Sequence, residues 1–317
     1  MLNIGVDLGG TNIAVGVVDE NYNIVFKTSR KTDAHRSSEE IVDDIAAAAL
    51  EAVEGAGAKI SDISYAGIGV PGSVDSKNGI VRFTPNMPFS NLPLKAMLLE
   101  RTGLNFDLEN DANAAALGEG LAGSGKGCSD FVMITLGTGV GGGIIAGGKL
   151  VTGVNSAGGE LGHIVICMGG EKCGCGRHGC FESYGSVSAL VSQTKKKMQE
   201  CPDSLMNKLA EKNGGEVNGR TAFDAMKQGD KAACEVVDRY TDYLACGLGS
   251  IINIFQPEIL SIGGGISKEG EVLLSPIREK LKAESFNNNL EVTTQLRTAT
   301  LFGDAGIIGA AFVGKIK

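Results

Sequence analysis

The chain has 317 residues, of which 43% are hydrophobic and 21% are charged, a balance typical of a globular protein large enough for two domains. Its net charge of −8 argues against nucleic acid or an anionic membrane as a partner, because nothing would offset the repulsion from phosphate. The chain has no basic leader before Asp7 and no apolar run of membrane-spanning length, so we expect a cytoplasmic protein.

Strands and a helix alternate in the first part of the chain. Residues 2–18 predict two strands joined by a glycine turn, since apolar and β-branched residues flank DLGGT on both sides. A helix is expected to begin after Ser37, which forms the capping-box pattern with Glu40, and to end at Gly55. The buried strand that follows ends before Pro71. This region is therefore of mixed α/β type.

Residues 130–151 repeat the opening pattern of strand, glycine turn and strand. This repetition indicates an internal duplication, with one glycine hairpin in each domain. Farther along, residues 239–255 predict a helix, 258–265 a strand that ends in glycines, and 304–314 a helix of small residues. We expect a small α/β domain at 1–113, completed by the C-terminal helix at 303–317, and a large α/β domain at 114–302.

Two glycine-rich segments match familiar nucleotide-binding patterns, and we reject both. GLAGSGK at 120–126 lacks the hydroxyl residue of a phosphate loop, because position 127 is Gly, and it follows a predicted helix. Gly137, Gly139 and Gly142 satisfy the dinucleotide pattern, but a strand follows them where that motif requires a helix.

The two glycine hairpins are better interpreted as phosphate cradles, whose exposed N–H groups bind an anion. Thr11 and Thr138 would add hydroxyl donors, and Asp7 would hold Mg²⁺ directly or through water. Two ordinary glycine turns are the alternative. The glycines that end the strand near residue 263 suit the wall of an adenosine pocket. The candidate nucleotide-binding residues are Asp7, Gly9, Gly10, Thr11, Asn12, Gly137, Thr138, Gly139, Gly263 and Gly264.

Three cysteines, Cys173, Cys175 and Cys180, lie within eight positions, and His163 precedes the first of them by ten. A disulfide framework is not expected in the cytoplasm, so the cluster points to a metal. Three thiolates and one imidazole form a closed tetrahedral zinc site. An iron–sulfur centre and three reduced thiols are the alternatives. His178 is a competing ligand that we expect to point outward.

The order of the motifs DLGGT, VPG, END, GTGVGGG, GGELGH, CGCGRHGC and GGG resembles that of the ROK family of sugar kinases. This resemblance covers nearly the whole chain, and GELGH and the cysteine cluster are its most specific parts. It implies an α/β fold of two ribonuclease-H-like domains, as in actin, hexokinase and Hsp70, with a cleft between them. It also implies ATP with Mg²⁺ as co-substrate, a sugar as acceptor, and a homodimer.

The resemblance also assigns site residues. By itself the sequence predicts that Asp111 caps a helix, whereas the resemblance makes it the catalytic base. Asp75 is the other acid considered for the role of base. Asn86, which would otherwise be read as a turn residue between two prolines, matches a sugar-binding Asn of the family. The residues implied in sugar binding are Gly72, Asn86, Asn110, Asp111, Glu160, His163 and Glu182, and the zinc would draw the last three together.

We therefore expect an ATP-dependent kinase that transfers the γ-phosphate to the 6-hydroxyl of glucose. Kinases for N-acetylmannosamine, N-acetylglucosamine or fructose share the same scaffold and remain alternatives. A sugar-responsive regulator is a further one, although such regulators carry a DNA-binding domain before the first glycine motif, which begins here at Asp7.

Overall fold

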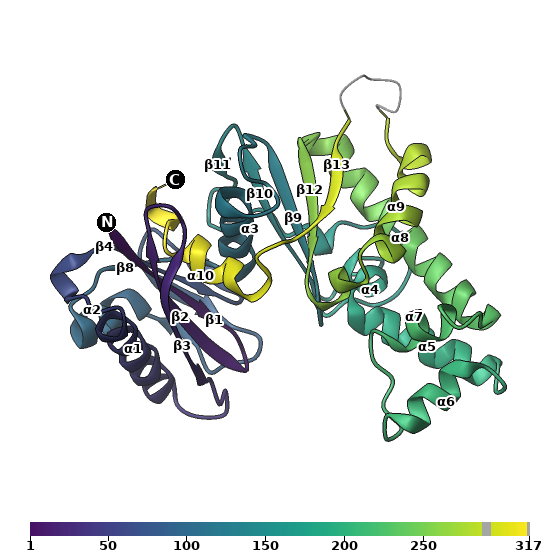
Figure 1. Ribbon diagram of the computed structural model, residues 1–317, viewed down its shortest axis with the longest axis horizontal. Coiled ribbons are helices and arrows are strands. Elements are labelled where there is room, and N and C mark those ends of the chain that lie inside the picture. The colour runs from purple at the N-terminus through teal and green to yellow at the C-terminus, as the bar shows by residue number, and fades with distance from the viewer. Residues whose placement is uncertain (287–292, 316–317) are drawn as a thin grey trace. The chain divides into compact units, whose positions relative to one another are not determined.

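The structure, a computed structural model, describes residues 1–286 and 293–315 (Figure 1). Its internal contacts form two compact units. The first unit comprises Met1–Met133, Gly142–Gly159 and Ala299–Lys317, and the second comprises Ile134–Gly141 and Glu160–Thr298. The domain bounds expected from the sequence differ from those of the contact units and stay a prediction.

A mixed five-stranded sheet forms the centre of the first unit, in the order β3-β2-β1-β4-β8. The first three strands of the chain pair antiparallel, whereas β1, β4 and β8 run parallel. The carboxyl ends of these three parallel strands therefore meet at one edge of the sheet. The strands are β1 (Leu2–Leu8), β2 (Asn12–Asp19), β3 (Ile24–Lys31), β4 (Ile63–Val70) and β8 (Phe106–Asn110).

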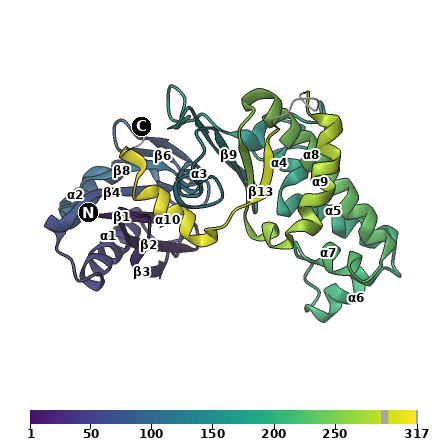
Figure 2. The same ribbon diagram turned by 45° about the horizontal axis from the view of Figure 1, so that its top comes forward.

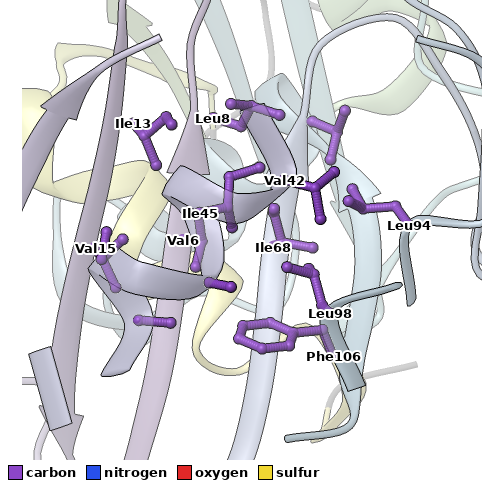
Figure 3. Close-up of a cluster of buried hydrophobic side chains, with 14 of the residues drawn as sticks. Val6, Leu8, Ile13, Val15, Val42, Ile45, Ile68, Leu94, Leu98 and Phe106 are labelled. Atoms are coloured by element: carbon purple, nitrogen blue, oxygen red, sulfur yellow. The ribbon is translucent and has the colours of Figure 1, made fainter. Parts of the chain in front are cut away.

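Helices α1 (Ser38–Gly55) and α2 (Leu94–Thr102) bury their apolar residues against one face of this sheet. Figure 3 shows Val42 and Ile45 of α1 near Val6 and Ile68 of the strands. The predicted capping box is present, since Ser37 accepts the amide of Glu40 and the Glu40 side chain accepts that of Ser37. A single 3₁₀ turn, Ile60–Asp62, leads into β4.

Helices α3 (Asp111–Ala122) and α10 (Ala305–Ala310) lie on the other face (Figures 1 and 2). The backbones approach closely, because a Cβ added at Gly5 would lie 1.9 Å from the carbonyl oxygen of Ile307. Gly118 of α3 similarly meets the Ala305 carbonyl oxygen at 2.1 Å. The C-terminal helix thus packs against β1 and α3 of the first unit. Its flanking 3₁₀ turns are Phe302–Asp304 and Val313–Lys315.

A small antiparallel sheet follows β4 in the chain and was not predicted. It has the order β5-β6-β7 and contains β5 (Ser73–Asp75), β6 (Ile80–Phe83) and β7 (Ser90–Leu92). Val74 and Val81 pair across it and are buried in the core of the first unit.

The second five-stranded sheet has the order β11-β10-β9-β12-β13. Strands β9 and β10 form the second glycine hairpin, which confirms the predicted repetition of strand, turn and strand. The bounds of the two units fall within these two strands. The strands are β9 (Phe131–Leu136), β10 (Val140–Ala146), β11 (Lys149–Leu150), β12 (Ile259–Gly263) and β13 (Gln295–Thr298).

The second unit is mostly helical, and its longest helix, α8 (Lys231–Phe255), buries Tyr240 and packs along α9 (Glu271–Glu284) (Figure 2). In the described ranges, no helix has both the length and the apolar character needed to cross a membrane. The remaining helices are α4 (Glu182–Gly185), α5 (Val187–Glu200), α6 (Leu205–Lys212) and α7 (Thr221–Met226), with 3₁₀ turns at Leu161–His163 and Gly265–Glu269.

Candidate active site and metal centre

Two acidic residues mark the carboxyl edge of the first sheet. Asp7 is the penultimate residue of β1, and Asp111 follows β8 directly. Burial raises the pKa of the Asp7 carboxyl to about 6; the charge of Asp111 raises it as well, and that of Lys27 lowers it. The edge therefore holds two carboxyl groups that repel each other, an arrangement that a bound cation would relieve.

The start of α3 differs from the helix cap that the sequence predicted. Asn110, in extended conformation, is the N-cap, and its side chain accepts the amides of Ala112 at 2.9 Å and Asn113 at 3.2 Å. The Asn110 side chain also donates to the carbonyl of Gly72 at 3.2 Å. The interpretation of Asp111 as the cap is therefore wrong, because the residue before it fills that role and leaves Asp111 in the first helical turn.

Asp75, the acid compared with Asp111, closes a turn between β5 and β6. Its carboxylate accepts hydrogen bonds from Asn78 and is paired with Arg82. The hydrogen bond from the Asn78 side chain, followed by that from Arg82, lowers the pKa of Asp75. A carboxylate held in this way stabilises the turn and is poorly suited to accept a proton from a substrate.

The first glycine turn projects from the sheet between β1 and β2. The Gly9 amide donates to the Asn12 carbonyl at 2.9 Å, and Gly10, Thr11 and Asn12 are exposed. A Cβ at Gly10 would meet only the Cβ of Asn86, at 3.9 Å. The turn thus presents open backbone, and the structure brings Asn86 next to it.

The second glycine turn, between β9 and β10, is closed by a hydrogen bond of 3.0 Å from the Gly137 amide to the Gly139 carbonyl. Thr138 at its tip is exposed. A Cβ at Gly137 would enter open space, whereas a Cβ at Gly139 would lie 2.3 Å from Oε2 of Glu182. The two glycines therefore face different surroundings.

The glycines after β12 lie close to this turn. Gly264 has a φ of +86°, and a Cβ there would lie 2.1 Å from the carbonyl oxygen of Leu136. Gly263, the last residue of β12, is buried, and Gly265 would direct a Cβ into open space. Close approach of two strand ends thus accounts for a glycine at position 264.

The structure brings the four predicted metal ligands together. Ligand atoms of His163, Cys173, Cys175 and Cys180 all lie within 4.8 Å of one another. Nδ1 of His163 lies 3.6 Å from Sγ of Cys173, and Sγ of Cys175 lies 3.7 Å from Sγ of Cys180. Sulfur atoms at zinc–sulfur distances of about 2.3 Å are about 3.8 Å apart in a tetrahedron, so the residues fit a zinc ion.

The loop that carries the cysteines is held by its own backbone. The Cys173 amide donates to the Arg177 carbonyl at 2.8 Å, and the chain pairs again between Lys172 and His178. His178 is exposed and lies outside the four-ligand group, as predicted. Burial raises the pKa of the Cys180 thiol to about 12, whereas a backbone hydrogen bond from Arg177 lowers that of the exposed Cys175.

His163 ends a single 3₁₀ turn that begins beyond Glu160. Its amide donates to the Glu160 carbonyl at 3.0 Å, so the acid and the imidazole belong to one hydrogen-bonded turn. Since Nδ1 faces Cys173, Nε2 is the ring nitrogen left for another partner. The Glu160 residue is exposed.

Glu182, the first residue of α4, has contacts that the sequence did not reveal. Its Oε2 accepts the amide of Val140 at 3.0 Å, and the Sγ of Cys173 lies 3.5 Å from its Oε1. One carboxylate thus touches both the glycine hairpin and a candidate metal ligand.

Sequence reasoning also missed two buried glutamates next to and within α3. Glu109 is fully buried and accepts the amide of Asn110 at 2.9 Å and the side chain of Asn113 at 3.0 Å. Glu119 is fully buried too, and it accepts the amides of Thr300 and Leu301 at 2.9 and 2.6 Å. A glutamate in an otherwise apolar strand, or in a helix of small residues, was the feature of the sequence that could have indicated a buried carboxylate.

Residues 3–316 match the model of the ROK family. A glucokinase of Thermotoga maritima is 43% identical over 313 residues, which cover 98% of this chain and 96% of that protein. A glucokinase of Streptomyces coelicolor is 40% identical, with the same coverage of both chains. The crystal structure of a ROK family glucokinase from Streptomyces griseus, in complex with glucose and AMPPNP, superposes with a TM-score of 0.83 at 39% identity and covers 99% of both chains. These matches confirm the predicted α/β fold of two ribonuclease-H-like domains, and the chain belongs to the ROK family.

Proposed function

We propose that this protein is a glucokinase, which transfers the γ-phosphate of ATP to the 6-hydroxyl of glucose. Relatives named as glucokinases, similar to this chain over almost its whole length, support the assignment. The structural observation that carries it is the position of Asp111. Asn110 is the N-cap of α3, whereas Asp111, whose Oδ1 also accepts the Ala112 amide at 2.9 Å, lies close enough to Asp7 for its charge to raise the pKa of that carboxyl.

Asp111 is the general base in this proposal. Phosphoryl transfer requires alignment, neutralisation of charge and a carboxylate to accept the proton of the attacking hydroxyl. Asp111 would take the proton from the 6-hydroxyl as that oxygen attacks the γ-phosphorus. The alternative acid, Asp75, is already bound to Arg82.

The nucleotide would be held by the two glycine turns and by Asp7. The open space at Gly10 and Gly137 leaves room for phosphate oxygens near backbone amides. Asp7 would hold Mg²⁺, which neutralises phosphate charge and would relieve the repulsion between Asp7 and Asp111. The other residues proposed for the nucleotide are Gly9, Thr11, Asn12, Thr138, Gly139, Gly263 and Gly264.

Two groups of residues are proposed to bind the sugar. In the first unit they are Gly72, Asn86 and Asn110. The side chain of Asn110 already accepts two amides, so its contribution would be the second hydrogen of its amide group. In the second unit they are Glu160, His163 and Glu182.

We assign a structural zinc ion to His163, Cys173, Cys175 and Cys180. Four protein ligands leave no position for a substrate or water, so this metal would shape the site without taking part in chemistry. The distances between the ligand atoms support zinc. Through His163 the metal would fix the orientation of a sugar-binding imidazole.

Cytoplasmic location and a homodimeric state complete the proposal. The location rests on the eight unpaired cysteines, which suit a reducing compartment. The dimer rests on resemblance to the family, and the molecular mass in solution tests it.

The substrate is tested by initial rates with Mg-ATP and a panel of glucose, mannose, fructose, N-acetylglucosamine and N-acetylmannosamine. We expect the highest kcat/KM for glucose. A higher value for another sugar would reassign the acceptor within the same family. Absence of turnover with every sugar, in a folded and metal-loaded protein, would contradict the assignment as a kinase.

A further inference from the structure

The glycine at position 139 leaves room for a protein carboxylate. A Cβ there would lie 2.3 Å from Oε2 of Glu182 and 3.3 Å from its Cδ, distances that no side chain tolerates without displacing the carboxylate. Gly139 does not have a positive φ, so its backbone conformation is open to alanine. The need for glycine at this position therefore comes from the space that Glu182 occupies.

The next residue, Val140, is held on two sides by the metal-binding segment. Its amide donates to Oε2 of Glu182 at 3.0 Å. On its other side, a Cβ at Gly162 would lie 2.2 Å from the Val140 carbonyl oxygen, so the turn that ends in His163 packs directly on the carbonyl of the same residue. Glu182 in turn lies 3.5 Å from Cys173. The glycine hairpin and two of the four candidate metal ligands, His163 and Cys173, are thus joined through the backbone of Val140 and the side chain of Glu182.

Gly137 and Gly10 lack such contacts. Gly137 would direct a Cβ into open space, and Gly10 would approach only Asn86, at 3.9 Å. A ligand can therefore reach these two positions, whereas at Gly139 the carboxylate is already present. The missing side chain at position 139 leaves room for the Glu182 carboxylate, whereas the missing side chains at positions 137 and 10 leave room for a bound molecule.

We infer that Glu182 is a positioning residue for the nucleotide: it holds the glycine turn at 137–139 against the metal-binding loop, so that metal occupancy affects nucleotide affinity as well as sugar affinity. This inference rests on the proposed function, because the glycine turn must bind phosphate for its position to matter. Its physical basis is the hydrogen bond from Val140, which fixes the direction of the amides in the turn.

The first test is a double-mutant cycle on the dissociation constant for Mg-ADP, measured calorimetrically in the absence of sugar. Gly139→Ala and Glu182→Ala should each weaken binding about fivefold, the usual value of one hydrogen bond. The double variant should bind no more weakly than Glu182→Ala alone, because the alanine at 139 then fills space that the carboxylate has left. Multiplied effects would overturn the inference, since alanine would then act on the phosphate itself.

Gly137→Ala is the matched comparison. Its Cβ would not approach Glu182, so its effect on Mg-ADP binding should be the same with Glu or Ala at position 182. If Gly137→Ala no longer affected Mg-ADP binding in the Glu182→Ala protein, the carboxylate would act on the whole turn. The inference that its effect is specific to position 139 would then be wrong. If the unaltered protein did not bind Mg-ADP, the proposed function would fail and the inference with it.

The second test follows the Val140 amide by hydrogen exchange and does not depend on nucleotide. Its protection should fall in Glu182→Ala and in protein stripped of metal, and should be largely retained in Glu182→Gln, whose amide oxygen still accepts the bond. The Gly9 amide, which donates to Asn12 in the other glycine turn, is the reference. Unchanged protection of Val140 in a stripped protein, with metal loss confirmed by analysis, would overturn the link between metal and hairpin.

Discussion

The negative charge of Asp111 raises the pKa of the Asp7 carboxyl, and burial of Asp7 raises it further, by the larger amount. The pKa of Asp7 rises from 3.8 to about 6, so the folded protein favours the protonated form. The contribution of protonated Asp7 to the free energy of unfolding is therefore fully present below pH 4 and is lost as the pH rises through about 6.

Asp7→Asn should remove this pH dependence. Relative to the unaltered protein, the variant should gain unfolding free energy between pH 4 and pH 7, by up to about 3 kcal/mol for two pKa units. Urea denaturation at several pH values measures it. Asp19→Asn is the control with the opposite sign, because hydrogen bonds from Asn23 lower the pKa of Asp19. A gain that does not vary with pH would contradict the burial of a titrating Asp7.

Gly10→Val should raise the KM for ATP much more than the KM for glucose. The valine side chain would occupy open space beside the turn, where we place a phosphate. We expect at least about a tenfold rise for ATP, which corresponds to about 1.4 kcal/mol of binding free energy. Steady-state kinetics with each substrate varied in turn measure both constants. Equal rises in both constants would mean that the turn is only structural.

Cys175→Ser should release the metal and weaken glucose binding more than nucleotide binding. His163 would lose its orientation and Glu160 and Glu182 their common support, whereas the nucleotide would be affected through Glu182 alone. We expect the affinity for glucose to fall by roughly tenfold or more. Metal analysis should find about one zinc per untreated chain and no visible absorption of an iron–sulfur centre. Cys234→Ser, at an exposed cysteine of α8, is the control. A protein confirmed to be free of metal that still binds glucose normally would limit the metal to a role in stability.

Glu119→Ala should destabilise the protein by at least about 3 kcal/mol, because it leaves several buried donors without an acceptor. The carboxylate accepts the amide and hydroxyl of Ser124, both at 2.8 Å, as well as the amides of Thr300 and Leu301. The midpoint of urea unfolding measures the loss, and Glu100→Ala, at an exposed position of α2, is the control. Similar midpoints for both variants would contradict this role of Glu119.

Local signals in the sequence were enough to predict several elements. The capping box of Ser37 and Glu40 and the two glycine turns depend on spacing along a short segment, and they lie where they were expected; the four candidate metal ligands also come together. Strand β3 was missed because only one face of it is even partly buried and its second half, residues 27–31, is entirely polar.

Contacts between distant segments were beyond prediction. Glu182 and Val140 are 42 positions apart, and no local pattern relates them. The cap of α3 was misplaced by one residue, because Asn110 and Asp111 are both good caps and only the backbone conformation decides between them.

The central claim, that Asp111 is the base for phosphorylation of glucose, is tested most directly by the turnover of Asp111→Asn with glucose and Mg-ATP, measured together with its dissociation constant for glucose. The amide preserves the shape of the side chain but cannot accept the proton. Turnover should therefore fall by about 10²- to 10⁴-fold, while glucose affinity changes little. Asp75→Asn, whose carboxylate is paired with Arg82, should keep most of the turnover. Near-normal turnover of Asp111→Asn in a folded protein would contradict the claim.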